Sequence, residues 1–397
     1  MEYLSDRINS LSESATIAMS KKSRELQEQG IDIINLSLGE PDFNTPDYIK
    51  SAAKNAIDNN FSKYPPVAGY KELKQAIKDK FKRDNGLDYD LNQIVVSTGA
   101  KQTIANLIMC LVNPGDEVIV PTPYWVSYLE LIKLAGGIPV FVESTIDTQF
   151  KISPNALEKV ISPKSKMIIF SSPSNPTGSV YTNTELEALA NVLAKKKDLF
   201  IVSDEIYELI NFEGEHYSIA AFENVKDQTI TVNGVSKGYA MTGWRIGYMG
   251  APAPIAAACE KMQGQFTSGA CGIAQKAAET AISQNSDEIE MMRNAFKKRR
   301  DLLIELLKDV QGVKTYSPQG AFYLFPDISA YFGKKYEDKK IENANDLCLF
   351  LLEKGHVACV PGEAFGSPEC LRISYATSED KIKEAVKRIK ATFELLH

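Results

Sequence analysis

The sequence predicts an α/β protein with a large domain, built on a mainly parallel sheet covered by helices on both faces, and a smaller α+β domain. Through residues 46–290, short β-rich runs alternate with helical stretches, which is typical of parallel strands joined by covering helices. One long amphipathic stretch follows at residues 291–307. The length of 397 residues also suits two domains better than one.

The elements can be placed in chain order. Residues 1–45 are expected to form an N-terminal arm and part of the small domain, residues 46–290 the large domain, and residues 291–397 the small C-terminal domain. Strands of the large domain are expected near residues 94–98, 117–120, 138–142, 166–171, 199–203, 229–233 and 246–250. Those of the small domain are expected within residues 315–325 and 371–375.

Several of these strands are followed by residues suited to binding. Gly99, Asn175, Asp204 and Lys237 all fall at or just after strand ends. Ligands of open α/β sheets bind outside the carboxyl ends of the strands, so a site is expected there.

The composition is that of an ordinary soluble globular protein, with 44% hydrophobic and 24% charged residues and a net charge of −6. Scattered basic residues disfavour a nucleic-acid partner, and the densest basic run, residues 297–300, is expected on the solvated face of a helix. Neither a signal peptide nor a membrane span is indicated, so the cytoplasm is expected. The six cysteines are expected to be reduced, buried thiols, and no metal site is expected because cysteine and histidine do not cluster.

Lys237 lies in residues 233–245, NGVSKGYAMTGWR, among glycine, small and aromatic residues rather than other charges. Partial desolvation lowers the pKa of a lysine amine and makes it a nucleophile that can form a Schiff base with an aldehyde. Ser236 and Arg245 nearby can hold a phosphate dianion. This combination indicates pyridoxal phosphate, although a buried structural lysine would give the same local pattern.

Asp204 ends the strand expected at residues 199–203, and Tyr207 follows three residues later. Pyridoxal phosphate withdraws electrons well only while its ring nitrogen stays protonated, which needs a buried carboxylate partner. Asp204 fits that need, and the Tyr207 hydroxyl can reach the same ring. A helix N-cap at Asp204 and core packing of Tyr207 are the structural alternatives, but their occurrence together with Lys237 favours the cofactor.

Two further turns contribute weaker signals. Residues 170–178, FSSPSNPTG, hold Asn175 on a rigid turn, where its amide can donate to the cofactor's phenolic oxygen and to a substrate carboxylate; an ordinary Asn-Pro turn is the alternative. Residues 95–103, VVSTGAKQT, place small residues where a strand enters an apolar helix, and the free N–H groups there can bind phosphate. This segment lacks the spacing of a Walker loop or a dinucleotide fingerprint.

Arg372 lies in an alternating strand segment, with Leu371 and Ile373 facing the opposite side. An arginine in so apolar a strand needs an anion, which is either a substrate carboxylate or the partner in a structural salt bridge.

Taken together, these motifs resemble those of fold type I pyridoxal phosphate enzymes, in the class I and II aminotransferase family and its bacterial aspartate aminotransferase subgroup. The matching motifs stand in the family's order and cover nearly the whole chain. They are GEPDF at 39–43, PYWVSY at 123–128, SNPTG at 174–178, SDEIY at 203–207, SK to GWRIGY at 236–248 and LRISYA at 371–376.

The resemblance implies roles for individual residues. Lys237 is similar to the lysine that binds the cofactor and moves the substrate proton, Asp204 to the partner of the ring nitrogen, and Arg372 to the arginine that grips the substrate α-carboxylate. The other cofactor contacts implied are Tyr207 and Asn175 at the ring hydroxyl, Trp125 on the ring face, and Gly99, Ala100, Lys101, Ser236 and Arg245 at the phosphate. Gly39 resembles a backbone contact to the carboxylate, and Tyr64 a tyrosine that reaches the neighbouring subunit's phosphate, which implies a homodimer with shared sites.

The resemblance also implies ping-pong transfer of an amino group between an L-amino acid, aspartate first, and 2-oxoglutarate. Methionine, aromatic amino acids and prephenate are the alternative substrates. Two other classes are a pyridoxal phosphate C–S lyase and a non-catalytic regulator that binds pyridoxal phosphate. Such regulators carry a DNA-binding domain before this fold, whereas the aminotransferase pattern here begins by about residue 14.

The chain departs from the family pattern at a position that bears on substrate choice. In relatives that also handle prephenate, a lysine lies four residues before the threonine of the Ser-Ala-Thr motif at residues 14–16, and Ser12 stands at that position here. This departure disfavours prephenate and weakens the prediction of aspartate. Arg7, Lys21, Lys22 or a residue of a partner chain can supply the missing cation.

Overall fold

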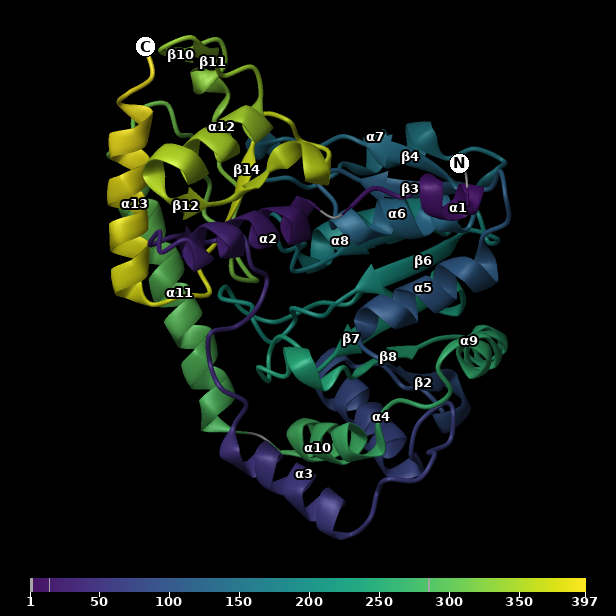
Figure 1. Ribbon diagram of the computed structural model, residues 1–397. Helices are drawn as coiled ribbons and strands as arrows, with labels where there is room; N and C mark the ends of the chain where they lie inside the picture. Colours follow the sequence, from purple (N-terminus) through teal and green to yellow (C-terminus); the bar gives the residue numbers. More distant parts are fainter. Residues whose placement is uncertain (1–2, 14, 285) are drawn as a thin grey trace.

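The computed structural model describes residues 3–13, 15–284 and 286–397, and Figure 1 traces the chain from end to end. Ser14, the first residue of the Ser-Ala-Thr motif, lies outside the described residues. Among the helices of the described ranges, none combines the length and the apolar character needed to cross a lipid bilayer.

A central sheet organises the larger part of the chain. Its strands are β2 (Ile94–Ser97), β3 (Glu117–Pro121), β4 (Ile138–Val142), β5 (Ser165–Ser171), β6 (Phe200–Asp204), β7 (Thr229–Gly234) and β8 (Gly247–Gly250). They are ordered β2-β8-β7-β6-β5-β3-β4. The pairs from β7 through β4 are parallel, and β8 runs antiparallel to both of its neighbours. The predicted mainly parallel sheet is therefore confirmed.

Helices cover both faces of this sheet, as the sequence predicted. On one face, where Val202 points, lie α5 (Ala100–Leu111), α6 (Val126–Leu134) and α9 (Ala253–Phe266). On the other, where Ile201 points, lie α7 (Pro154–Val160) and α8 (Asn183–Leu193), and beside them α4 (Lys71–Asn85) and α10 (Gly272–Ser283), with α3 (Asp47–Asp58) packed on α10. Apart from the edge strand β4, where Ile138 and Phe141 are exposed, the strands are largely buried on both faces, which is why apolar residues dominate them.

The register of the parallel strands aligns their carboxyl ends. Ser171 at the end of β5 pairs with Asp204 at the end of β6, and Asp204 pairs with Val232 near the end of β7. The turns that follow the three strands therefore emerge at one edge of the sheet, where ligands of such sheets bind.

A second group of elements packs around α11, the long helix that runs along one side of the molecule in Figure 1. Helix α11 spans Asp287–Leu307 and begins at Ser286, whose side chain accepts a hydrogen bond from the Glu288 backbone N–H. Around it lie α2 (Ala15–Glu28), α12 (Ala344–Phe350), α13 (Glu379–Phe393), the sheet β13-β14-β9 (Val360–Pro361, Leu371–Ser374, Tyr323–Leu324) and the pair β1-β12 (Ile34–Asn35, Val357–Ala358). The short elements α1 (Asp6–Asn9), β10 (Lys335–Tyr336) and β11 (Lys339–Lys340) complete the fold. The division into three domain segments stays a prediction.

The strand expected within residues 315–325 is confirmed at Tyr323–Leu324, which forms β9 and is shorter than that range. The residues before it use their backbone groups elsewhere. The N–H of Gly320 donates to Gly178 O at 2.8 Å, and the N–H of Ala321 donates to Ile210 O at 2.8 Å. This segment therefore lines the loops after β5 and β6 instead of extending a strand.

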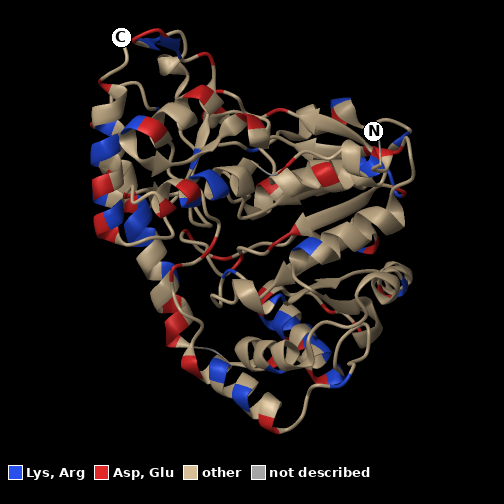
Figure 2. Cartoon of the chain, in the orientation of Figure 1, with Lys and Arg blue, Asp and Glu red and all other residues tan. Residues whose placement is uncertain are grey.

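The expectation for the basic run at residues 297–300 is half wrong. Arg299 and Arg300 are 9% and 5% exposed. Arg299 makes a bidentate pair with Asp42, its Nη1 and Nη2 lying 2.6 and 3.1 Å from the two carboxylate oxygens, and Arg300 pairs with Glu213 at 2.9 Å. Figure 2 shows acidic and basic residues interspersed along α11 and α13, but the sequence could not reveal which of the basic residues are buried and paired with an acid from another segment.

The cysteines are free thiols, as expected, but not all of them are buried. Cys259, Cys348, Cys359 and Cys370 are buried, whereas Cys110 is half-buried and Cys271 is exposed. The apolar neighbours of Cys271 in the sequence did not predict its position just before α10.

Gly247 allows β8 to cross closely over the start of α5. A Cβ built on Gly247 would collide with the backbone of Gly99 and Ala100, whereas a Cβ on the exposed Gly243 would meet open space. We expect Gly247→Ala to lower the free energy of unfolding by about 1–3 kcal/mol, because backbone atoms cannot yield to overpacking. Denaturant unfolding followed by circular dichroism measures this, with Gly243→Ala as the matched control. Equal stability of the two variants would contradict the close crossing.

Candidate active site

A cavity of about 320 Å³ lies at the carboxyl ends of β5, β6 and β7. Its walls come from the turns after these strands, from the first turns of α2, α5 and α6, and from β9 and β14. The residues predicted from sequence that line it are Gly39, Ala100, Lys101, Trp125, Asn175, Asp204, Tyr207, Ser236, Lys237, Arg245 and Arg372. The structure thus brings together residues from almost the full length of the chain.

Lys237 follows β7, and its amine points into the cavity. Its Nζ donates to Gly39 O at 2.6 Å and lies 5.7 Å from the centre of the Tyr207 ring and 5.9 Å from that of Phe322. Burial lowers the pKa of Lys237 to about 8, although the Glu40 carboxylate opposes the shift. About a tenth of the amine is therefore neutral, and nucleophilic, at pH 7.

Asp204 ends β6 and is 4% exposed. Its Oδ2 accepts a hydrogen bond from the Tyr128 hydroxyl at 2.6 Å, and its Oδ1 accepts one from the Ile206 N–H at 3.3 Å. Burial raises the pKa of Asp204 to about 6, against the hydrogen bond from Tyr128. A cationic ring N–H placed beside this carboxylate would favour its ionised form.

The hydroxyl of Tyr207 meets that of Tyr323, at 2.8 Å. Tyr207 follows β6 and Tyr323 lies in β9, so the contact joins the two groups of elements across the cavity. Burial raises the pKa of both phenols, and they therefore stay protonated and can act as hydrogen-bond donors.

Arg372 in β14 is 2% exposed. Its Nη1 donates to Asn175 Oδ1 at 2.9 Å and its Nη2 to Ser37 O at 2.6 Å, while its guanidinium stacks 4.5 Å from the centre of the Tyr323 ring. Both acceptors are neutral, and within the described residues Nε has no hydrogen-bond partner. Burial lowers the pKa of Arg372, but the group stays a cation and is suited to a carboxylate ligand.

The opposite end of the cavity is built for an anion. Gly99 precedes α5 with a φ of +81°, and a Cβ there would collide with the Arg245 guanidinium. Arg245 therefore lies directly over the N-terminus of α5, where Ala100 begins the helix, and its Nη1 donates to Thr242 O at 2.7 Å. With the Ser236 hydroxyl nearby in the cavity wall, this end combines helix N–H groups, a guanidinium and a hydroxyl, which is a set that binds phosphate.

Aromatic and cationic side chains form the remaining wall. Trp125 packs edge-on against Tyr128, with ring centres 5.4 Å apart, and Lys101 Nζ lies 5.1 Å from the centre of the Trp125 ring. Burial, and then the Arg245 charge, lower the pKa of Lys101. Lys101 thus lines the cavity beside Trp125. The resemblance had implied that it contacts the phosphate.

Several residues singled out from the sequence do not line this cavity, namely Tyr64, Ser12 and the candidate cations Arg7, Lys21 and Lys22. Tyr64 is 96% exposed, in the loop before α4. Ser12 is exposed, and its backbone N–H donates to Glu130 Oε2 at 2.8 Å. The chain by itself therefore does not bring Tyr64 to the phosphate end.

Sequence reasoning missed the contacts of Tyr128 and Tyr323. Tyr128 lies three residues after Trp125, one helical turn away, so its position in the PYWVSY motif was a signal that it could share the site. Tyr323 carried no comparable signal.

The residues present fit pyridoxal phosphate. A buried lysine with a lowered pKa, a buried carboxylate, an aromatic wall and an anion site at a helix N-terminus correspond to its aldehyde, ring nitrogen, ring face and phosphate. Lys237, Asp204, Trp125, Ser236 and Arg245 could hold these four parts.

Comparisons with known proteins agree with this geometry. The family model "Aminotransferase class I and II" matches residues 31–389. A probable aspartate/prephenate aminotransferase from Rhizobium leguminosarum bv. phaseoli is 47% identical, with 98% of each chain covered. The crystal structure of an aspartate aminotransferase from Rhizobium meliloti superposes with a TM-score of 0.96 at 40% identity, covering 100% of both chains. An aspartate aminotransferase from Thermus thermophilus with maleate gives a TM-score of 0.92 at 40% identity, covering 99% of this chain and 100% of that one.

A family match over most of the chain and relatives of nearly equal length establish the assignment: this chain belongs to the class I and II aminotransferase family and is a transaminase.

Proposed function

We propose that this transaminase moves the amino group of L-aspartate to 2-oxoglutarate by a ping-pong mechanism, with pyridoxal phosphate as its cofactor. The observation that carries the proposal is that one cavity of about 320 Å³ is lined by Lys237, Asp204 and Arg372. These supply a nucleophilic amine, a buried carboxylate and a buried cation whose contacts are neutral. Each is needed at a different point of the reaction.

When bound, pyridoxal phosphate supplies the electron sink for the substrate's α-carbon. Asp204 would keep the ring nitrogen protonated, with its carboxylate oriented by Tyr128. Lys237 would hold the cofactor at rest and later accept and return the α-proton, since an amine with a pKa of about 8 can do both near neutral pH. Tyr207 and the Asn175 side-chain N–H₂ would donate to the ring hydroxyl oxygen.

Arg372 would bind the substrate α-carboxylate. Its guanidinium already sits in a rigid frame made by Asn175, Ser37 and the Tyr323 ring, so little conformational entropy is lost when a carboxylate adds its own hydrogen bonds. The Gly39 carbonyl oxygen accepts a hydrogen bond from the Lys237 amine. The Gly39 backbone would lie beside the bound α-carboxylate.

The preference for a dicarboxylate needs a second cation. Lys101 lines the cavity and is therefore better placed for the distal carboxylate than Ser12, whose backbone is tied to Glu130. The names of the relatives, aspartate and aspartate/prephenate aminotransferases, support the same substrate class. A cytoplasmic location stays a prediction.

We also propose a homodimer with shared active sites. Tyr64 is a large aromatic residue that is 96% exposed in the single chain. Exposed apolar side chains also occur at Leu4, Ile8 and Ile17, and Ile17 lines the mouth of the cavity. In the proposed dimer a second copy covers these residues, and the family resemblance implies that its Tyr64 reaches the anion end of the partner's cavity.

Lys237→Ala should reduce turnover of aspartate by about 10⁴-fold or more, because it removes both the nucleophile and the proton carrier. Borohydride reduction of the loaded wild-type enzyme, followed by peptide mapping, should label Lys237. Lys101→Ala serves as the control and should still be labelled at Lys237. Labelling of a different lysine would overturn the assignment.

Arg372→Lys should lower kcat/KM for aspartate and phenylalanine alike, by about 10- to 100-fold, because the charge remains but the planar bidentate donor is lost. Lys101→Met, assayed with saturating pyridoxal phosphate so that any weaker hold on the phosphate does not count, should instead lower kcat/KM for aspartate and leave that for phenylalanine nearly unchanged. Steady-state kinetics with both substrates separates the two roles. An equal loss for both substrates in Lys101→Met would remove Lys101 from substrate selection.

A mixed dimer of Tyr64→Phe and Lys237→Ala subunits tests the shared sites. One of its sites should carry both changes and the other neither, so the mixed dimer should keep about half of the wild-type activity. Differently tagged subunits allow it to be purified and assayed beside each homodimer. A fully active monomer in light scattering would contradict the proposal.

A further inference from the structure

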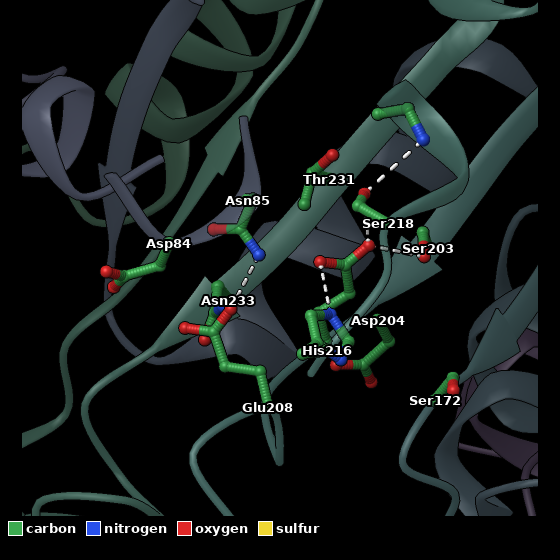
Figure 3. A network of polar contacts seen from close by, with 12 residues as sticks. Asp84, Asn85, Ser172, Ser203, Asp204, Glu208, His216, Ser218, Thr231 and Asn233 are labelled. Atoms are coloured by element: carbon green, nitrogen blue, oxygen red, sulfur yellow. Dashed lines mark hydrogen bonds and ion pairs between the residues drawn. The ribbon is translucent and has the colours of Figure 1, made fainter. Parts of the chain in front are cut away.

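A buried polar cluster lies on the side of β6 that faces away from the cavity. Side chains alternate along a strand, so Ser203 and Glu205, the neighbours of Asp204, point to that other side. Glu205 is 1% exposed. Its Oε1 accepts hydrogen bonds from the hydroxyls of Ser203 at 2.9 Å and Ser218 at 2.6 Å, and its Oε2 lies 2.9 Å from His216 Nε2. Figure 3 shows Ser203, Ser218 and His216 gathered beside Asp204.

The second carboxylate of this cluster, Glu208, has a cation of its own. Glu208 forms an ion pair with Lys80 and accepts a hydrogen bond from Asn85 Nδ2 at 2.9 Å. Ligand atoms of Glu205, Glu208 and His216 lie within 4.8 Å of one another, a spacing that a metal ion could use. The Lys80 ammonium already lies against Glu208, however, so with His216 protonated the two carboxylates face two cations.

The Glu205 charge bears directly on Asp204. Burial is the main cause of the raised pKa of Asp204, and the negative charge of Glu205 raises it further, while the Tyr128 hydrogen bond and the Lys237 charge lower it. Two carboxylates on successive residues repel each other, so an unbalanced Glu205 favours the protonated form of Asp204. The proposed role of Asp204 requires the ionised form.

His216 is the group that can cancel this repulsion. Burial opposes its charge, but the attraction and hydrogen bond of Glu205, and then the Glu208 charge, outweigh burial and the Lys80 charge, so the pKa of His216 is raised. Its ring lines a surface pocket of about 450 Å³, through which protons can reach the cluster. The titratable and charged groups that face the pair or line this pocket are Lys80, Arg83, Asp84, Tyr89, Glu208, Tyr239, Asp287, Glu290 and Arg293.

We propose that the buried Glu205–His216 pair keeps Asp204 ionised, an inference that rests on the proposed function of Asp204. Glu205 anchors the strand end from behind through the Ser203 and Ser218 hydroxyls, and His216, 2.9 Å from Glu205, neutralises the charge of this anchor when its ring is protonated. Glu205 and His216 are therefore positioning residues, which act on the reaction only through Asp204.

Two substitutions should shift the titration of Asp204 in opposite directions. His216→Gln keeps a donor for Glu205 but removes the positive charge, and it should raise the pKa of Asp204 by about half a unit to one unit. Glu205→Gln removes the repelling charge and should lower it. The double variant should return close to the wild-type value, whereas a purely structural role would shift both single variants in the same direction.

The titration is followed by ¹³C NMR of the full-length chain labelled with [4-¹³C]aspartate, and the signal is assigned by its loss in Asp204→Asn. Equilibrium dialysis at each pH gives the dissociation constant for pyridoxal phosphate. As the pH is lowered, this constant should begin to rise at a higher pH in His216→Gln than in the wild type. Tyr89→Phe is the matched control: it removes a buried hydroxyl that contacts Thr231 on the neighbouring strand at 3.0 Å, leaves every charge of the cluster in place, and should lower stability without shifting Asp204.

Shifts in the same direction, or no shift, would overturn the inference. If one single variant does not fold, the direction of the other decides. The NMR titration requires no catalysis, so its outcome is separate from the proposed function, which fails if the loaded wild-type enzyme does not transaminate aspartate.

Discussion

The structure depends above all on one buried cation, the Arg372 guanidinium. It donates to the Ser37 carbonyl in the N-terminal segment and to Asn175 after β5, while lying in β14 itself, so one side chain joins three distant parts of the chain. Both acceptors are neutral. A buried charge without a counter-ion is costly, and a carboxylate ligand removes that cost. The joining of β14 to the N-terminal segment and to the loop after β5, and the proposed binding of a substrate α-carboxylate, therefore have the same physical origin.

Burial explains the chemistry of the other two central residues. It lowers the pKa of Lys237 to about 8 and raises that of Asp204 to about 6, so each group moves toward its neutral form. Opposite shifts of this kind in one cavity are typical of reactive sites. The pair of Arg299 with Asp42 is different, because its bidentate contact lies away from the cavity and satisfies both charges.

Strand β6 connects the reactive side of the sheet with a supporting one. Val202 and Asp204 face α5 and α6, whereas Ile201 and Ser203 face the opposite layer. In a sheet covered on both faces, a residue at a strand end can thus contact a ligand on one face, while its chain neighbours are held by a buried hydrogen-bond network on the other face. The parallel register places the ends of β5 and β7 beside it, which concentrates the functional residues on rigid backbone.

The sequence by itself determined the alternation of strands and helices, and the identity of residues such as Lys237 and Asp204, because strand pattern and turn chemistry are local properties. It did not determine their partners. Tyr128, which donates to Asp204, lies 76 residues away from it in the chain, and Arg299 was expected on a solvated face although it pairs with Asp42, 257 residues away. Helical periodicity shows which side chains share a face, but which acid or hydroxyl meets that face depends on sheet register and on how the elements pack. Only the tertiary structure decided those contacts.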